Sequence, residues 1–141
     1  MGCDIHVHVE VKIRGEWMHL SAIEMSRNYA LFARMADVRN YGDVTPMAPA
    51  RGLPDDTTFL TKFDSDRWST DAHSHSHLSA AEMADLSDWW AEFCKAEGIS
   101  GSWFEDRFGW IFNSSWSGFT RYPEDRPRGV EDARCVFWFD N

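Results

Sequence analysis

The fold is decided by the stretch CDIHVHVEVKI, residues 3–13. Apolar side chains occupy its odd positions, and polar or charged side chains occupy its even positions. An alternation with a period of two over this length predicts a β-strand with one face in the core. The polar face carries Asp4, His6, His8, Glu10 and Lys12. We therefore expect a half-buried strand that presents two imidazoles on the same side.

A second strand is expected directly after the first. Arg14-Gly15 is suited to a two-residue turn, in which Gly15 supplies the positive φ. The second strand then covers residues 16–20. The register predicts three cross-strand pairs, which are Val11 with Met18, Glu10 with His19 and Val9 with Leu20. The hairpin therefore places a third histidine on the polar face of the first strand.

Two helices and a last strand follow from spacing and caps. Apolar residues at helical spacing predict a helix over 27–38, capped by Ser26 or Asn28. Ser79 and Glu82 form a capping box before a helix that ends near Glu97, closed by Gly98. Residues 133–139 are apolar enough for a central strand. The remaining segments are predicted as a loop over 39–57, a short strand over 58–63, a polar segment over 64–78, strand and loop over 103–119 and a loop over 121–132.

These elements predict a single compact α+β domain over residues 1–141. It contains an N-terminal β-hairpin in a mainly antiparallel sheet and two principal helices. The net charge of −9 argues against non-specific binding of DNA, because the chain repels phosphates. Three scattered cysteines suggest a reducing cytosol rather than a disulfide framework. No apolar run reaches the roughly 20 residues of a membrane span, so no membrane partner is expected.

Histidines are concentrated in two short segments, DIHVH at 4–8 and DAHSHSH at 71–77. Both contain the pattern D-x-H-x-H, and residues two apart on a strand project to the same side. Imidazole and carboxylate together suit Zn²⁺, Mn²⁺ or Fe²⁺, with Zn²⁺ or Mn²⁺ as the leading prediction. The predicted ligands are His6, His8, His73, His75 and His77, and the candidate general bases are Asp4, Glu10 and Asp71. A shared site requires the 71–77 segment to lie beside the first strand.

Other interpretations of these segments stay open at the level of sequence. Histidines on the outer face of a strand can be ordinary surface residues, and a Ser/His segment can be a flexible loop. The aromatic-rich stretch 103–119 can stack a nucleotide base, although its aromatic side chains are more simply explained as part of the core. Arginines between 121 and 128 alternate with acidic residues, which favours a solvated, salt-bridged loop over a phosphate site.

Two resemblances bear on these motifs. The D-x-H-x-H segments resemble the metal motif of the amidohydrolase superfamily and of the polymerase and histidinol phosphatase superfamily. The resemblance covers five residues, and a chain of 141 residues is too short to form the barrel of those enzymes. The chain also resembles a family of small bacteriophage proteins, through MGCDIH, NYALFARMADVR, GLPDD, DAHSHSHL and VFWFDN. This second resemblance spans nearly the whole chain and implies a phage or prophage setting, and hence the cytoplasm of a bacterial host cell.

Two functions from different classes are compatible with the sequence. The first is a metal-dependent hydrolase acting on a phosphoester, either a nucleotide or a nucleic-acid fragment. The alternative is a non-catalytic phage protein that counters host defence by binding a host protein or a small nucleotide signal. An open coordination position favours the first, and a closed four-ligand site favours the second.

Overall fold

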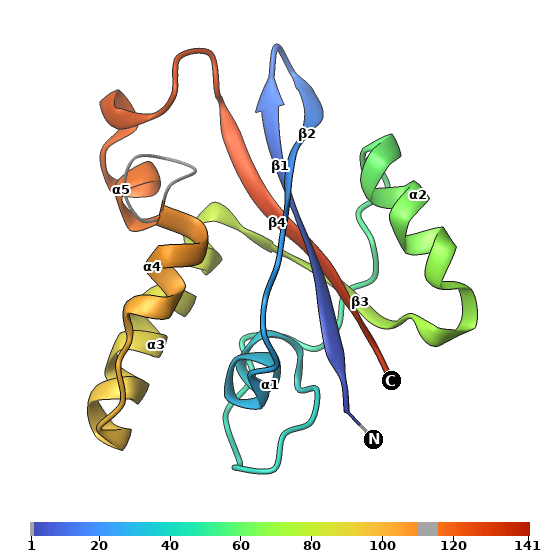
Figure 1. Ribbon diagram of the computed structural model, residues 1–141. Helices are drawn as coiled ribbons and strands as arrows, with labels where there is room; N and C mark the ends of the chain where they lie inside the picture. Colours follow the sequence, from blue (N-terminus) through green and yellow to red (C-terminus); the bar gives the residue numbers. More distant parts are fainter. Residues whose placement is uncertain (1, 110–115) are drawn as a thin grey trace.

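A computed structural model describes residues 2–109 and 116–141 and contains one four-stranded antiparallel sheet (Figure 1). The strands, in the order β2-β1-β4-β3 across the sheet, are β1 (Asp4–Ile13), β2 (Glu16–Ile23), β4 (Asp132–Asp140) and β3 (His73–Ser79). The helices are α1 (Tyr29–Ala36), α2 (Phe59–Trp68), α3 (Ala80–Glu97), α4 (Ser102–Phe108) and α5 (Trp116–Arg121), and short 3₁₀ turns occur at Ser69–Asp71 and Pro123–Asp125. The predicted α+β class with its N-terminal hairpin is confirmed.

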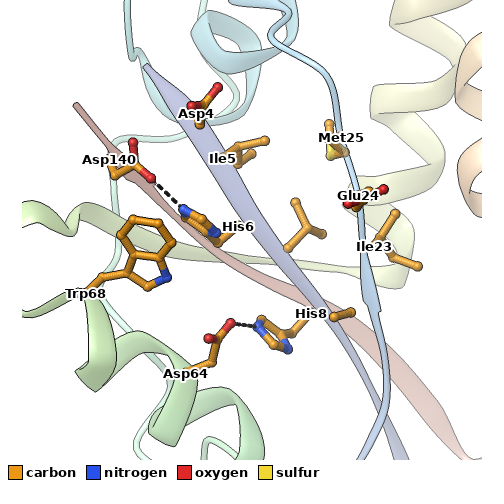
Figure 2. Close-up of a pocket in the computed structure, with 12 residues that line it drawn as sticks. Asp4, Ile5, His6, His8, Ile23, Glu24, Met25, Asp64, Trp68 and Asp140 are labelled. Atoms are coloured by element: carbon orange, nitrogen blue, oxygen red, sulfur yellow. Dashed lines mark hydrogen bonds and ion pairs between the residues drawn. The ribbon is translucent and has the colours of Figure 1, made fainter. Parts of the chain in front are cut away.

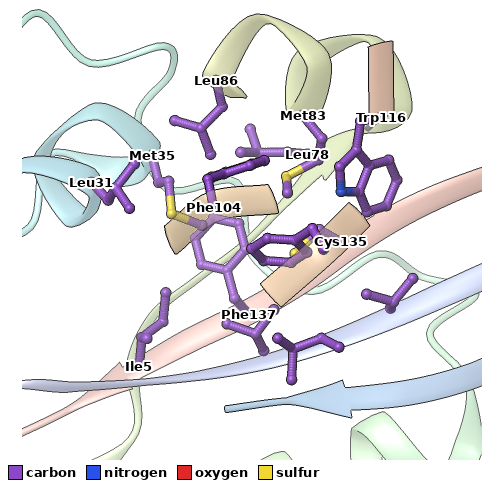
Figure 3. Close-up of a cluster of buried hydrophobic side chains, with 14 of the residues drawn as sticks. Ile5, Leu31, Met35, Leu78, Met83, Leu86, Phe104, Trp116, Cys135 and Phe137 are labelled. Carbon is purple, nitrogen blue, oxygen red and sulfur yellow. The ribbon is translucent and has the colours of Figure 1, made fainter. Parts of the chain in front are cut away.

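The sheet has one apolar and one polar face. The odd positions of β1 lie with Cys135, Phe137 and Leu78 in the main core, where Met83, Phe104 and Trp116 cover them (Figure 3). Helices α3, α4 and α5 lie on this side, whereas α2 lies across the opposite face (Figure 1). The even positions of β1, which include both N-terminal histidines, therefore face α2.

The hairpin follows the predicted register for two of its three pairs. Val11 lies opposite Met18 and Glu10 opposite His19. A bulge between Val9 and Glu10 then shifts the register, so that Val9 lies opposite Ser21 and not Leu20. The extra residue explains the error, because a bulge places two residues against one. Arg14 and Gly15 both have positive φ, as a type I′ turn requires.

Three segments differ from the sequence prediction. Residues 58–63 belong to α2 and its cap rather than to a strand, and the polar segment 64–78 contains the end of α2 and most of β3. Helix α2 has no apolar stripe because its inward residues, Thr61 and Ser65, are polar. Within 103–119, the described residues form α4 and α5 instead of a strand, and residues 110–115 lie outside the described range. Of the described aromatics there, Phe104, Phe108, Trp116 and Phe119 are buried, which supports the core interpretation.

Helix α3 confirms the predicted caps. Ser79 and Glu82 form the full capping box, and Gly98 ends the helix in the left-handed conformation. The last strand is central as predicted, because β4 lies between β1 and β3. Among the described residues, no helix combines the length and apolar character that crossing a membrane demands.

Glu82 makes the stability dependent on pH at the start of α3. Its carboxylate accepts hydrogen bonds from the Arg51 guanidinium at 2.6 and 2.8 Å, and these lower its pKa from 4.5 to about 2. A lowered folded-state pKa stabilises the protein above pH 4.5, and this contribution is lost as the pH falls from 4.5 towards 2. We expect the melting-temperature difference between wild type and Glu82→Gln to shrink over that window. It is measured by thermal unfolding from pH 7 to 2.

The control is Asp85→Asn, which removes an exposed carboxylate from the same helix. The difference in melting temperature between Asp85→Asn and wild type is expected to stay constant from pH 4.5 to 2. A difference between wild type and Glu82→Gln that stays constant down to pH 2 would contradict the assignment.

Candidate active site

A pocket of about 360 Å³ opens on the polar face of the sheet, between β1, β2 and α2 (Figure 2). Its ionisable and aromatic lining residues are Asp4, His6, His8, Glu24, Asp64, Trp68 and Asp140. They come from β1, from the residue after β2, from α2 and from the end of β4. The period-two projection of β1 brings both histidines to this face, and α2 supplies Asp64 and Trp68 one helical turn apart.

His6 lies between a carboxylate and two indoles. Its Nε2 is 2.6 Å from Oδ2 of Asp140. Its ring centroid is 4.2 Å from that of Trp68 and 5.6 Å from that of Trp138. Because the carboxylate accepts, Nε2 is the donor, and a neutral His6 then has its free lone pair on Nδ1. A histidine oriented through one nitrogen by a carboxylate is the arrangement that metal-binding histidines commonly show.

His8 is the centre of a relay of three side chains. Its Nε2 is 2.8 Å from Oδ2 of Asp64, and its Nδ1 is 2.9 Å from Nε2 of His19. Asp64 accepts, so a neutral His8 accepts in turn from the N–H of His19. Burial, and then the charge of His8, lower the pKa of His19, which favours its neutral form. The relay fixes both imidazole rings and aligns a path for a proton between them.

The pocket carries an excess of negative charge. Four carboxylates line it, from Asp4, Glu24, Asp64 and Asp140. Two arginines offset part of this charge: Arg27 binds Asp4 at 2.6 Å and Arg67 approaches Asp64 at 3.3 Å. The hydrogen bond from Arg27 holds the pKa of Asp4 below its usual value, so Asp4 stays ionised. A pocket with this field attracts cations and repels a bare phosphate.

Glu10, one of the candidate bases, lies outside this pocket. Its side chain is fully buried, with 0% exposed, and binds Arg134 at 2.8 Å, Thr61 at 2.9 Å and the backbone N–H of Thr58 at 3.0 Å. Burial raises the pKa of Glu10, but these hydrogen bonds outweigh it and leave the pKa below its usual value. The carboxylate therefore fixes the start of α2 on the sheet, and its oxygens are already engaged.

The second histidine segment does not lie beside the first strand, which corrects the prediction of a shared site. It forms β3, and β4 separates it from β1. Neighbouring strands are about 4.8 Å apart, so two steps amount to about 10 Å. The Trp138 indole of β4 occupies the space between the two histidine segments. Its ring stacks on those of His6, His8 and His75, with centroid distances of 5.6, 5.3 and 6.0 Å.

A bulge also divides the histidines of β3 between the two faces. The register shifts between His73 and Ser76, and Ser74 has a φ of 53°. His73 consequently stacks on Phe139 of the core side, whereas His75 lies by Trp138 on the polar face. His77 contacts the carbonyl of Gly52 at 3.3 Å. The remaining candidate base, Asp71, is exposed in the 3₁₀ turn after α2 and does not line the pocket.

Comparison of the chain with protein-family models, curated proteins and solved structures gives no match. The resemblance to bacteriophage proteins therefore stays an expectation. Within residues 2–109 and 116–141, no three histidine, cysteine or acidic side chains are grouped to hold a metal ion. The histidines of the pocket are instead paired with carboxylates.

Four contributors to the pocket were missed at the level of sequence: Glu24, Asp64, Trp68 and Asp140. Asp64 and Trp68 are one turn apart on a helix without an apolar stripe, so no periodicity marks them. Asp140 closes an apolar strand, and its pairing with Asp4 in register was the only available signal. That signal depends on knowing that β4 pairs with β1.

Proposed function

We propose that the protein is a divalent-metal-dependent hydrolase that acts on a phosphoester, a nucleotide or a nucleic-acid fragment, in the pocket of His6 and His8. The observation that carries the proposal is the pair of carboxylate-oriented imidazoles, His6 with Asp140 and His8 with Asp64, in one open pocket. Paired imidazoles and carboxylates supply both proton transfer and metal ligation.

The donor types suit Zn²⁺ or Mn²⁺, although their present arrangement is one of hydrogen bonds. His6 offers Nδ1, and Asp4 and Asp140 carry carboxylates at the same end of the pocket. Arg27 binds both oxygens of Asp4, and His6 Nε2 binds Oδ2 of Asp140, so each carboxylate ligates an ion only by giving up such a bond. Both nitrogens of His8 are engaged, so His8 joins a metal site only by giving up Asp64 or His19. His6, Asp4 and Asp140 are therefore the proposed ligands, and His8 is the proposed acid–base residue.

A cation also reconciles the charge of the pocket with an anionic substrate. Four carboxylates against two arginines repel a phosphoester unless a divalent ion offsets them. When bound, such an ion lowers the pKa of water and polarises the phosphoryl group.

The side chains of the pocket supply the remaining roles. His8 accepts a proton from the attacking water at Nδ1 once His19 releases its hydrogen bond to that nitrogen, and Asp64 stabilises the imidazolium that forms. Trp68 flanks His6 and offers an indole on which a nucleobase stacks, a contact worth on the order of 1–3 kcal/mol. In this proposal His8, supported by Asp64, has the role of general base for which Asp4, Glu10 and Asp71 were the candidates from the sequence.

A second candidate is a non-catalytic phage protein that binds a host protein in the bacterial cytoplasm. The outer surface of α2 favours it, because Phe59, Leu60 and Phe63 are exposed, Phe59 by 78%. The Phe59 and Phe63 rings stack at 5.9 Å without a covering element among the described residues. Exposed aromatic clusters of this kind are common in protein interfaces.

Metal binding is tested by thermal unfolding of untagged protein with and without Zn²⁺ or Mn²⁺. An ion at 100 times its Kd stabilises the native state by about 2.7 kcal/mol, which raises the melting temperature by roughly 5–10 °C. His6→Ala is expected to lose most of this shift. His73→Ala, which changes the histidine at the same position of the other D-x-H-x-H segment, is expected to retain it.

Two results would count against the metal site. One is an unchanged melting temperature of wild type with both ions. The other is equal loss of the shift in His6→Ala and His73→Ala, which would indicate non-specific binding to histidines.

A further inference from the structure

Ser65 and His75 form a hydrogen-bonded pair on the other flank of α2. Ser65 lies on α2 with 5% of its surface exposed, and its Oγ is 3.0 Å from Nε2 of His75 on β3. Asp64 and Trp68 face the β1 side of the helix, whereas Ser65 faces β3. The pair therefore belongs to a different pocket from the one proposed for phosphoester hydrolysis.

This second pocket has a volume of about 590 Å³, which is in the range of small-molecule sites. Its lining comprises Gly52, Leu53, Lys62, Asp66, Ser69 and the pair itself. Lys62 precedes Ser65 by three residues on α2, so the two side chains lie along one flank of the helix. A hydroxyl, an imidazole and an ammonium group thus share one open cavity.

The imidazole is suited to accept the serine proton. Burial, and then the charges of His73 and Lys62, lower the pKa of His75, so its neutral form prevails near pH 7. A neutral imidazole at hydrogen-bond distance from a serine hydroxyl is the arrangement of an activated nucleophile. A purely structural hydrogen bond between α2 and β3 is the competing explanation, and covalent labelling of the serine separates the two.

We propose that Ser65 is a nucleophile, activated by His75, that hydrolyses esters of small carboxylic acids. Ser65 Oγ attacks the carbonyl carbon and passes its proton to His75 Nε2. The bond from carbon to the alcohol oxygen breaks, and the alcohol leaves with the proton from His75. Water then attacks the acyl-serine with His75 again as base, which releases the carboxylic acid and restores Ser65. The Lys62 ammonium, which pairs with Asp66 in the same pocket, turns from that carboxylate to stabilise the negative charge of the tetrahedral intermediate.

The test is covalent labelling of the full chain with a fluorophosphonate, followed by peptide mapping. The probe transfers its phosphonyl group to Oγ, fluoride leaves, and the serine proton passes to His75. We expect one label per chain, at Ser65. His75→Gln keeps a hydrogen-bond partner for Ser65 but removes the base, so labelling is expected to slow by about 100-fold or more. Hydrolysis of p-nitrophenyl acetate is expected to fall in parallel.

Ser74→Ala is the matched control, because Ser74 Oγ is also 3.0 Å from a histidine nitrogen, Nδ1 of His73. Ser74 does not line the pocket, so its variant is expected to label at the wild-type rate. An unlabelled wild type, a label at another serine, or undiminished labelling of His75→Gln would each overturn the proposal. The labelled position is mapped on wild type, so the assignment to Ser65 does not depend on the folding of any variant.

Discussion

Asp64→Asn is expected to lower phosphodiester or nucleotide hydrolysis by about 100- to 10,000-fold, the contribution typical of a general acid–base residue. The amide cannot stabilise an imidazolium, and it alters the proton position on His8, which hydrogen-bonds to Asp64 at 2.8 Å. The substitution preserves the shape of the side chain. The measurement is the initial rate of hydrolysis with Zn²⁺ or Mn²⁺, over a panel of nucleotides and oligonucleotides.

Stability is not expected to account for that loss. Asp64 is partly exposed and lies at the surface of α2, so the melting temperature of Asp64→Asn should stay close to that of wild type. Asp66→Asn is the matched control, since Asp66 lies two residues away on the same helix and pairs with Lys62. Its rate is expected to equal that of wild type.

The outcome also discriminates between the two proposed functions. Equal rates for Asp64→Asn and wild type would remove the His8 relay from the mechanism. A wild type without hydrolysis across the whole panel would instead favour the protein-binding candidate. In that case, Phe59→Ser and Phe63→Ser should abolish partner binding while the pocket variants retain it.

Arg134→Met is expected to lower the free energy of unfolding by about 3–5 kcal/mol, the loss typical when one partner of a buried ion pair is removed. Arg134 binds Glu10 at 2.8 Å and Asp56 at 2.7 Å, and its guanidinium lies 4.0 Å from the centre of the Trp17 ring. Without it, the fully buried Glu10 carboxylate lacks its counter-charge. Chemical denaturation with urea measures the change.

Two further variants make the cause of that loss identifiable. Arg121→Met removes an exposed arginine whose Nη2 lies 3.3 Å from Oδ2 of Asp88. This substitution should lower the free energy of unfolding by less than about 1 kcal/mol. The double variant Glu10→Gln with Arg134→Met removes both charges, so it is expected to recover part of the stability. A double variant no more stable than Arg134→Met alone would show that lost packing, rather than the unpaired charge, dominates.

This ion pair also connects stability to the pocket. Glu10 binds Thr58 and Thr61 in the first turns of α2, and α2 carries Asp64, Ser65 and Trp68. Weakening of the Glu10 anchor should therefore loosen both flanks of the helix. We expect variants of Glu10 to impair both proposed activities together, whereas pocket variants impair one at a time.

The elements determined by the sequence alone are those with a local cause. The strict alternation over residues 3–13 determines which face of β1 joins the apolar core, since a shift by one residue would reverse every side chain. Helix α2 then covers the other face, where His8 and Glu10 are buried as well. Arg14-Gly15 determines the hairpin turn, and the Ser79–Glu82 box with Gly98 determines both ends of α3. The apolar run 133–139 likewise identified a central strand. The placement of His6 and His8 on one polar face follows from the same alternation.

The tertiary structure alone decided which side chains His6 and His8 contact. Helix α2 has polar inward residues, so its position depends on the buried Glu10–Arg134 pair, which comes from strands distant in the sequence. The bulge at Ser74 sends His73 and His75 to opposite faces, although their spacing alone predicts one face. The intervening β4 places Trp138 between the two histidine segments. Strand order and bulges arise from long-range pairing, and local spacing carries no information about either.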